Sequence, residues 1–285
     1  RKIVSLLLVE HVEPASIVAF TFTEKAAANM KSRIYKRVKE LGEDALCARL
    51  GEMYVGTIHG FCFHLLEDQF GYGSWGVLDE NQEMAYLMRV GWELNLTGSS
   101  NYTEKCQDFK RSVGVFYNEM LSRDEVKKRS PDFYYSLTKY ETCLDEHHRL
   151  TFDRMIALTV ENLRKRPEVG DFIQYLIVDE YQDINRAQQE LIEILGRGSK
   201  IFVVGDPRQT IYQWRGSDEH CFEEFAEYYQ QSETISIPEN RRSVQTIVQA
   251  ANYFSETFEK CRYSPMVYSR SEQGKAHLVE FPDKR

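Results

Sequence analysis

Short apolar runs recur along the chain and are typical of strands buried in a sheet. Each run mixes β-branched and aromatic residues, and each is followed by polar residues and then a helical pattern. The predicted strands are residues 17–22, 175–178, 200–204 and 234–237. Helical patterns occupy residues 26–38, 187–195 and 244–254. Because strands alternate with helices, the sequence predicts an α/β fold with a parallel, doubly wound sheet, whose ligands bind beyond the carboxyl ends of the strands.

The pattern changes between about residues 67 and 169. Strand signals disappear there and helical periodicity dominates, interrupted by a loop at residues 96–103 and by Ser130-Pro131. We interpret this region as an α-helical insertion on the first sheet and not as an independent module. One more strand is predicted near the end of the chain, at residues 276–281.

The chain opens on a basic and apolar segment, so a secretory signal has to be considered. Its apolar stretch is too short for a signal peptide, it lacks a small-residue cleavage site, and Glu10 and Glu13 follow at once. No window approaches the ~18 uninterrupted apolar residues of a membrane span. We therefore expect a helix at residues 1–8 and a cytoplasmic protein that does not bind a membrane.

Composition narrows the chemistry. The 285 residues suffice for one large or two modest domains. The six cysteines are scattered without a C-x-x-C pair, which argues against a zinc ribbon, an iron–sulfur cluster or a disulfide framework. We expect His147-His148, in a polar helical stretch, to be solvated and not to bind metal. The net charge of −8 argues against electrostatic binding of nucleic acid over the whole surface. It allows a local binding track in which bases stack on aromatic rings.

Two strand ends carry the candidate chemistry. The run at 175–178 ends abruptly in Asp179-Glu180, and a carboxylate pair in this position can hold Mg²⁺ through one member and polarise water through the other. Acidic residues are also favoured at helix N-termini, so a structural cap is the alternative.

The run at 200–204 ends in Gly205-Asp206 and opens into a loop with an amide, two aromatic rings and a cation. These side chains are Gln209, Tyr212, Trp214 and Arg215. The combination suits a junction between a phosphate site and a nucleic-acid track.

These two segments carry a resemblance to a known family. YLIVDEYQD (175–183) and VVGDPRQTIYQWRGSD (203–218) closely resemble motifs II and III of UvrD/Rep-type superfamily 1 DNA helicases. The resemblance extends to motif Ia, the DNA-contact motif after it, the segment before motif II, and motif IV. These matches are IVAFTFTEKAAANMKSRI (17–34), VGTIHGFCFHLL (55–66), LTFDRMI (150–156) and IPENRRSVQTIVQAAN (237–252). The resemblance implies a RecA-like, P-loop NTPase-type parallel sheet with an α-helical insertion subdomain.

The resemblance also implies a site that hydrolyses ATP with Mg²⁺. In it, Asp179 coordinates the Mg²⁺ of MgATP, and Glu180 activates the attacking water. Gln209 senses the γ-phosphate and links hydrolysis to the DNA track. Arg242 reaches the γ-phosphate as an arginine finger, since a cation there stabilises charge that grows in the transition state. Arg241 stands where the family commonly places an aromatic residue against adenine, and its guanidinium can also stack on a purine.

The same resemblance implies a track for single-stranded DNA and duplex junctions. Phe22, Tyr212 and Trp214 are expected to supply stacking faces for successive bases. Thr57 and His59 are expected to contact the strand. Arg215 is expected to add a phosphate contact. Burial in the core is the alternative for each of the aromatic residues.

The family's layout divides the chain into four parts. Residues 1–66 begin the first RecA-like domain (1A), 67–169 form the helical insertion (1B), 170–260 complete domain 1A with motifs II, III and IV, and 261–285 start a truncated second RecA-like domain. The family's G-x-x-x-x-G-K-[ST] phosphate loop and its motifs V and VI are missing from the sequence. We therefore expect this chain alone to hydrolyse ATP poorly or not at all.

The expected function is that of an ATP-dependent DNA helicase or translocase, which moves 3′→5′ on single-stranded DNA and unwinds duplexes in DNA repair or recombination. One alternative is a non-hydrolysing, helicase-like DNA-binding or scaffold subunit. Another is the motor part of a RecB/AddA-like helicase–nuclease, which Glu24 favours slightly because Rep-like members commonly carry Asn there. The pathway and the protein partners stay open.

Overall fold

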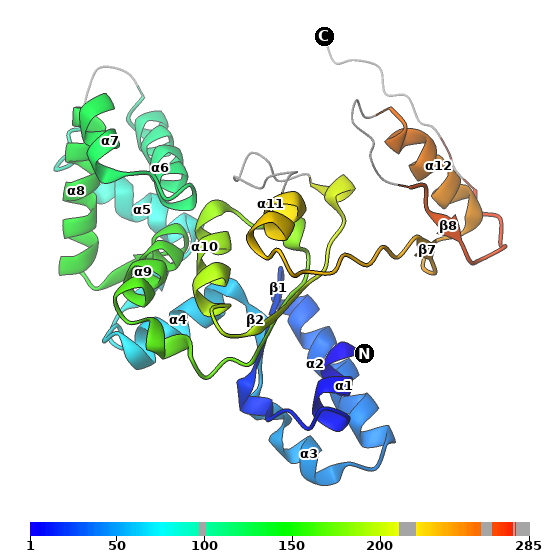
Figure 1. Ribbon diagram of the computed structural model, residues 1–285. Coiled ribbons are helices and arrows are strands. Elements are labelled where there is room, and N and C mark those ends of the chain that lie inside the picture. The colour runs from blue at the N-terminus through cyan, green and yellow to red at the C-terminus, as the bar shows by residue number, and fades with distance from the viewer. Residues whose placement is uncertain (97–100, 211–220, 258–263, 276, 278–285) are drawn as a thin grey trace. The chain divides into compact units, whose positions relative to one another are not determined.

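The computed structural model describes residues 1–96, 101–210, 221–257, 264–275 and 277 (Figure 1). The chain forms two compact units, residues 1–223 and 224–285. The helices and strands that begin in the first unit are α1 (Lys2–Leu8), β1 (Ile17–Thr21), α2 (Glu24–Glu40), α3 (Asp44–Arg49), β2 (Tyr54–Thr57), α4 (Ile58–Gln69), β3 (Gly76–Leu78), α5 (Glu80–Val90), α6 (Tyr102–Asn118), α7 (Arg123–Arg129), α8 (Pro131–Glu146), β4 (Arg149–Thr151), α9 (Phe152–Lys165), β5 (Tyr175–Val178), α10 (Arg186–Leu195), β6 (Lys200–Val203) and α11 (Cys221–Tyr228). Those of the second unit are β7 (Glu239–Asn240), α12 (Gln245–Ser255) and β8 (Val267–Tyr268).

A four-stranded parallel sheet lies at the centre of the first unit. Its strand order is β2-β1-β5-β6. Every residue of β1 and of β5 is buried, because each of these strands has a neighbour on both sides and helices on both faces. Strands covered on both faces need near-continuous apolar sequences, which is what these two show. The predicted α/β fold with a parallel sheet is thus confirmed.

Helices cover both faces of this sheet. On one face, α1 and α2 pack on the strands through a shared apolar cluster. Its buried members are Ile3, Leu6, Leu7, Ile17, Ala19, Ile34, Val38, Met53, Val55, Tyr175 and Ile177. On the other face, the ring of Phe20 packs edge-on against that of Phe61 in α4, with 5.2 Å between the centroids. Helix α9 packs against both α4 and α10 in that layer.

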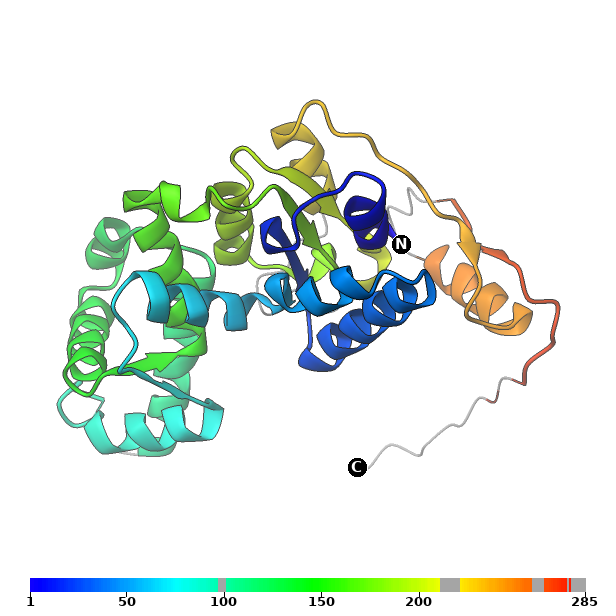
Figure 2. The same ribbon diagram turned by 90° about the horizontal axis from the view of Figure 1, so that it is seen from below.

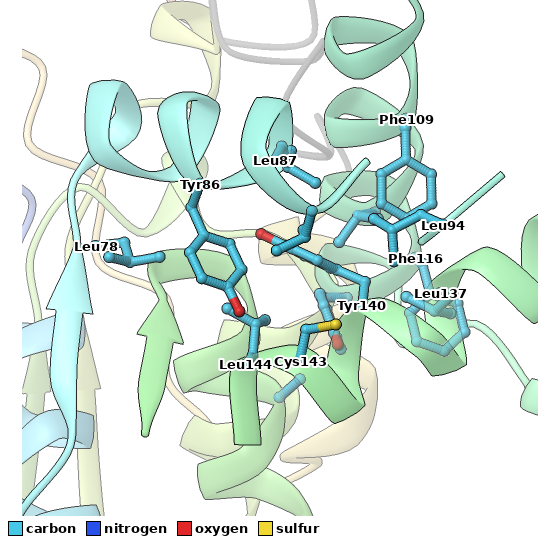
Figure 3. Close-up of a cluster of buried hydrophobic side chains, with 14 residues drawn as sticks. Leu78, Tyr86, Leu87, Leu94, Phe109, Phe116, Leu137, Tyr140, Cys143 and Leu144 are labelled. Carbon is cyan, nitrogen blue, oxygen red and sulfur yellow. The ribbon is translucent and has the colours of Figure 1, made fainter. Parts of the chain in front are cut away.

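Helices α5 to α8 form a helical subdomain at the end of the first unit that is distant from α1–α3 (Figures 1 and 2). Its core is aromatic and aliphatic (Figure 3). The buried residues of this core are Leu78, Tyr86, Leu87, Val90, Leu94, Phe109, Val113, Phe116, Tyr117, Leu137, Tyr140, Cys143, Leu144 and Ala157. The short parallel strands β3 and β4 pair beside it. The sequence did not predict this pair, because each strand has three residues and too little sequence to show an alternating pattern.

The strand predicted at residues 234–237 is wrong. Residues 234–237 have no strand hydrogen bonding, and Ile235 is 71% and Ile237 80% exposed, whereas a strand within the sheet would be buried. A short strand begins two residues later as β7, which pairs in parallel with β8. The strand predicted at 276–281 lies outside the described residues except for residue 277.

The described cysteines Cys47, Cys62, Cys106 and Cys143 are free thiols, and all but the first are buried. His147 and His148 are exposed, and the Nδ1 atom of His147 lies 2.7 Å from the hydroxyl of Tyr86. Among the helices in the described part of the chain, none combines the length and the apolar character needed to cross a membrane.

Candidate functional site

The carboxyl ends of the four parallel strands lie at one edge of the sheet. Thr21 of β1 pairs with Thr57 of β2. On the other side, Phe20 pairs with Val178 of β5, which pairs in turn with Val203 of β6. The segments that follow the strands therefore emerge side by side, in the order β2, β1, β5, β6. We call this edge the carboxyl edge; in parallel sheets it is the usual position of bound ligands.

Strand β5 delivers Asp179 and Glu180 to the carboxyl edge. The backbone N–H of Asp179 donates to the carbonyl of Phe20 at 3.0 Å. Glu180 has a left-handed backbone conformation (φ 54°, ψ 46°), which is uncommon for a residue with a side chain. The chain turns at this point, and the N–H of Tyr181 donates to the carbonyl of Val204 at 3.0 Å. Both neighbouring strands thus fix the backbone that carries the two carboxylates.

Negative charge is concentrated around Glu180. Burial first, and then the charge of Glu180, raise the pKa of Asp179. The same two causes raise the pKa of Asp183 to about 6, and its Oδ1 atom is buried without a hydrogen-bond partner. A cation beside these carboxylates would relieve the repulsion, so the site fits Mg²⁺ in charge and in ligand type.

Asp179 would hold such an ion together with its substrate and not as part of a protein cage. Within the described residues, no group of three or more His, Cys, Asp or Glu side chains could hold a metal. Mg²⁺ commonly takes one or two carboxylates from a protein and completes its shell with phosphate oxygens and waters. The single carboxylate of Asp179 matches that pattern.

A cleft of about 990 Å³ lies beside Asp179, between α1 and α2 and the strands β5 and β6. Its sheet side is apolar, with Ile177, Val178, Phe202 and Val204. Its helical side carries four cationic side chains. These are Arg1, Lys2, Arg33 and Arg37. The volume is that of a small-molecule site. Lys2 and Arg37 already pair with Glu10 and Glu40, so Arg1 and Arg33 are the cations that best suit a ligand with phosphates.

Arg33 is a candidate binding residue that sequence analysis did not single out, because a cation on a helix usually faces solvent. Met30 and Ile34 line the same cleft. Arg33 lies three residues after Met30, and Arg37 lies three residues after Ile34. Each arginine therefore shares a helical face with an apolar residue of the cleft. This spacing is the signal from which the sequence could have placed Arg33 in the cleft.

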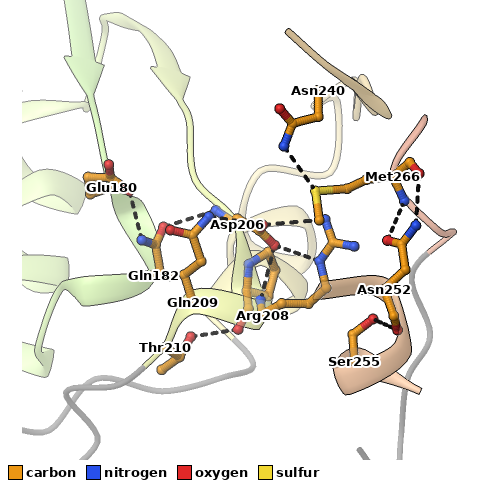
Figure 4. Close-up of polar contacts among 11 residues, drawn as sticks. Glu180, Gln182, Asp206, Arg208, Gln209, Thr210, Asn240, Asn252, Ser255 and Met266 are labelled. Atoms are coloured by element: carbon orange, nitrogen blue, oxygen red, sulfur yellow. Dashed lines mark hydrogen bonds and ion pairs between the residues drawn. The ribbon is translucent and has the colours of Figure 1, made fainter. Parts of the chain in front are cut away.

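Gln182 lies between the loops that follow β5 and β6 (Figure 4). Its side chain is 1% exposed. Its Nε2 atom donates to Oε2 of Glu180 at 2.8 Å and lies 3.5 Å from Oδ2 of Asp183. Its Oε1 atom accepts the backbone N–H of Asp206 at 3.1 Å. Sequence analysis assigned no role to Gln182 beyond its place in the motif.

Asp206 organises the loop after β6. Its carboxylate accepts hydrogen bonds from Nε of Arg208 at 2.9 Å and from Nε2 of Gln209 at 3.1 Å. Burial opposes ionisation of Asp206, but these hydrogen bonds hold its pKa below the usual range. Gln209 is exposed and closes the short 3₁₀ turn Pro207–Gln209.

Three of the predicted DNA-binding residues, Tyr212, Trp214 and Arg215, follow directly after this loop. They lie outside the described residues. Their contacts with DNA therefore stay predictions.

Phe22 and Thr57 lie on the other half of the carboxyl edge. Phe22 follows β1 and is 42% exposed, so it is not a core residue. Thr57 ends β2, and its hydroxyl donates to Oε1 of Glu24 at 2.8 Å and accepts the N–H of Gly60 at 3.2 Å. Thr57 thus caps α4 and holds Glu24 in place, and a contact with DNA would add to these two bonds.

His59 leads to a further exposed aromatic residue. Its ring packs edge-on against that of Phe152, with 5.5 Å between centroids and 89° between planes. Phe152 begins α9 and is 42% exposed. The sequence did not single it out, because one aromatic residue at a helix start looks the same whether it packs in the core or faces solvent.

Arg241 and Arg242 belong to the second unit. The Nε of Arg241 donates to Oε2 of Glu239 at 2.8 Å, and this carboxylate raises the pKa of the guanidinium. The backbone N–H of Arg242 donates to Oδ1 of Asn240 at 3.0 Å. Within this unit the two arginines therefore lie in a turn that Asn240 organises directly after β7.

Comparison with known proteins shows which family the chain resembles. The family model of the UvrD/REP helicase N-terminal domain matches residues 1–230. The ATP-dependent DNA helicase PcrA of Bacillus subtilis (strain 168) is 30% identical over 275 residues, which cover 88% of this chain and 34% of that protein. The ATP-dependent DNA helicase PcrA of Staphylococcus epidermidis (strain RP62A) is 31% identical over 266 residues, with 88% and 35% covered. The chain thus spans about a third of the length of these relatives.

Proposed function

The chain belongs to the UvrD/REP helicase family, and we propose that it forms part of an ATP-dependent motor that moves 3′→5′ on single-stranded DNA and unwinds duplexes. One observation carries this proposal. The carboxylate pair Asp179-Glu180, beside a basic cleft, follows β5. The exposed aromatic residue Phe22 follows the neighbouring strand β1 at the same edge of the sheet. The strand that presents Phe22 is hydrogen-bonded to the strand that presents Asp179 and Glu180.

The proposed nucleotide site is the cleft beside Asp179. Asp179 would hold the Mg²⁺ of MgATP, which would supply positive charge for phosphoryl transfer. Glu180 accepts a proton from the attacking water, and Gln209 contacts the γ-phosphate. Arg33 adds a cation for the phosphates, which its place in the cleft lining supports.

The proposed DNA track runs along the other half of the carboxyl edge. Phe22 and Phe152 offer exposed rings on which bases of any sequence stack. His59 orients the ring of Phe152, and Thr57 contacts the strand. Tyr212, Trp214 and Arg215 extend this track in the family's pattern.

The remaining assignments rest on the family resemblance. In it, residues 1–66 and 170–260 form one RecA-like domain with an insertion at 67–169, and residues 261–285 start a second domain. Arg242 and Arg241 are proposed to contact the γ-phosphate and the adenine. A role in DNA repair or recombination is proposed on the same basis.

An unwinding assay on the full-length protein that contains this chain tests the proposal. Duplexes with a 3′ or a 5′ single-stranded tail are supplied with ATP and Mg²⁺, and strand separation is followed by fluorescence. We expect unwinding of the 3′-tailed duplex, and we expect Glu180→Gln to abolish it while DNA binding remains. Preference for the 5′ tail would reject the direction. DNA binding without unwinding would leave a scaffold subunit as the function.

A further inference from the structure

We propose that Gln182 is a positioning residue, which holds the Glu180 carboxylate in place and ties it to the loop that carries Gln209. This inference rests on the proposed function, because it assigns Glu180 as the base and Gln209 as the γ-phosphate contact. It adds a third residue, which the nucleotide does not have to touch.

The first argument is a continuous series of hydrogen bonds between the two loops (Figure 4). Gln209 donates through Nε2 to the Asp206 carboxylate at 3.1 Å. The backbone N–H of Asp206 donates to Oε1 of Gln182 at 3.1 Å. Nε2 of Gln182 then donates to Oε2 of Glu180 at 2.8 Å. A displacement of Gln209 by a phosphate is therefore passed on to Glu180 through two intermediate residues.

The second argument is that a glutamine is the side chain that this position requires. Its amide accepts one hydrogen bond through oxygen and donates two through nitrogen, so it can bridge a backbone N–H and a carboxylate at the same time. A glutamate in its place would accept from Asp206 but would repel Glu180. Asp183, 3.5 Å from the same Nε2, offers a second carboxylate on this side of the amide.

The third argument is the close approach of Gly205. A Cβ atom at this position would lie 2.1 Å from Oε1 of Gln182, 2.9 Å from the ring of Phe222 and 3.1 Å from the backbone nitrogen of Tyr181. The absence of a side chain at Gly205 thus allows the Gln182 amide to reach the N–H of Asp206. Since Gln182 is 1% exposed, solvent offers its amide no alternative partners and the bridge is held in one arrangement.

A purely structural role is the competing explanation, because a buried amide with its bonds satisfied also stabilises a loop. The two roles differ in what they change. A structural role affects folding and the binding of nucleotide and DNA together. A positioning role affects the chemical step through Glu180 and leaves binding unchanged.

The test is steady-state ATP hydrolysis by the full-length protein with saturating oligo(dT), for Gln182→Met and for Gly205→Ala. The first substitution removes the amide, and the second displaces it. We expect each to lower kcat by about 10- to 100-fold, as misplacement of a catalytic group by about 1 Å does. The KM for ATP and the Kd for oligo(dT) should stay within about twofold, since neither residue binds these ligands directly. Gln107→Met, the same change at an exposed glutamine of α6, is the control and should match the unsubstituted protein.

A double substitution separates the two roles. In a Glu180→Gln background, where the residual hydrolysis is followed under single-turnover conditions, Gln182→Met should cause no further loss, because the group on which it acts has already been replaced. A further loss of the same factor, or a parallel loss of ATP and DNA binding with a lower melting temperature, would show a structural role and overturn the inference. Unchanged kcat in Gln182→Met would also overturn it and leave the proposed function intact. Absence of hydrolysis by the unsubstituted protein would overturn both.

Discussion

Glu180 combines an unusual backbone with a candidate chemical role. Its left-handed conformation (φ 54°, ψ 46°) costs a residue with a side chain about 1–3 kcal/mol. The hydrogen bonds on either side, from Asp179 to Phe20 and from Tyr181 to Val204, offset that cost. A conformation that its surroundings impose in this way is typical of residues whose position matters more than their contribution to stability.

Exposed aromatic residues at the carboxyl edge should contribute directly to DNA binding. We expect Phe22→Ala and Phe152→Ala each to weaken binding of single-stranded DNA by about 1–3 kcal/mol, or about 5- to 150-fold in Kd, because each removes one stacking face. Fluorescence anisotropy of a labelled oligo(dT) measures this change.

Phe172→Ala provides the matched control. Phe172 is 47% exposed, similar to the other two, but it precedes β5 at the opposite end of the strands. Its removal should leave the Kd unchanged. Equal losses for all three variants would show a general effect on the fold and would contradict a track at the carboxyl edge.

Candidate residues could be predicted from the sequence where they directly follow a recognisable run of apolar residues. Asp179 and Glu180 stand out because they follow a run of apolar residues without interruption. Arg33 and Phe152 were missed, because a cation on a helix and a ring at a helix start have several ordinary explanations. Their place at the site depends on the packing of distant segments, which a local pattern does not contain.

At the scale of the elements, β1, β5 and β6 were predicted from their apolar runs, whereas β2, β3 and β4 were not. β1 and β5 are wholly buried and apolar. β2 was not predicted as a strand, because Gly56 interrupts its apolar run. Glycine is needed there, since a Cβ atom would lie 2.6 Å from the hydroxyl of Tyr54. That hydroxyl donates to the carbonyl of Thr57 at 2.7 Å, a contact with no signal in the pattern of apolar residues.

In the helical subdomain, the buried Glu83 pairs with the partly exposed Lys110. Nζ of Lys110 lies 3.2 Å from Oε2 of Glu83, and the hydroxyl of Tyr140 donates to Oε1 at 3.2 Å. Burial raises the pKa of Glu83, although Lys110 acts in the opposite direction. Protonation of Glu83 therefore stabilises the fold. This contribution is complete below the ordinary pKa of 4.5 and is lost as the pH rises through the raised value.

Lys110→Met should destabilise this subdomain in a manner that depends on pH. At pH 7 the substitution leaves the ionised Glu83 without its cation, and we expect a loss of about 1–3 kcal/mol in the free energy of unfolding. The loss should vanish at acid pH, where Glu83 is neutral in both proteins. Urea unfolding of the 285-residue chain in a Trp214→Phe background measures it, because the fluorescence of this chain then comes from Trp75 and Trp92.

The control for this experiment is Lys128→Met, which removes an exposed lysine from α7 of the same subdomain. It should change the free energy of unfolding little at any pH. A loss for Lys110→Met that is equal at acid and neutral pH would show that its side chain acts by packing and not by charge.

At the scale of the whole molecule, positive charge is local. The chain has a net charge of −8, yet four cationic side chains line the cleft beside Asp179. An acidic protein repels nucleic acid over most of its surface. We therefore expect ATP to bind through the cleft and DNA through the aromatic residues of the carboxyl edge. Both rely on short-range contacts, which salt screens less than long-range attraction.

The coupling of these two ligands is the central claim, and stimulation of ATP hydrolysis by single-stranded DNA tests it most directly. The measurement compares the full-length protein and its Glu180→Gln variant, with and without oligo(dT), and records DNA binding for both. We predict strong stimulation in the unsubstituted protein, and its loss in the variant with DNA binding retained. Hydrolysis that does not respond to DNA, or that survives Glu180→Gln, would contradict the account.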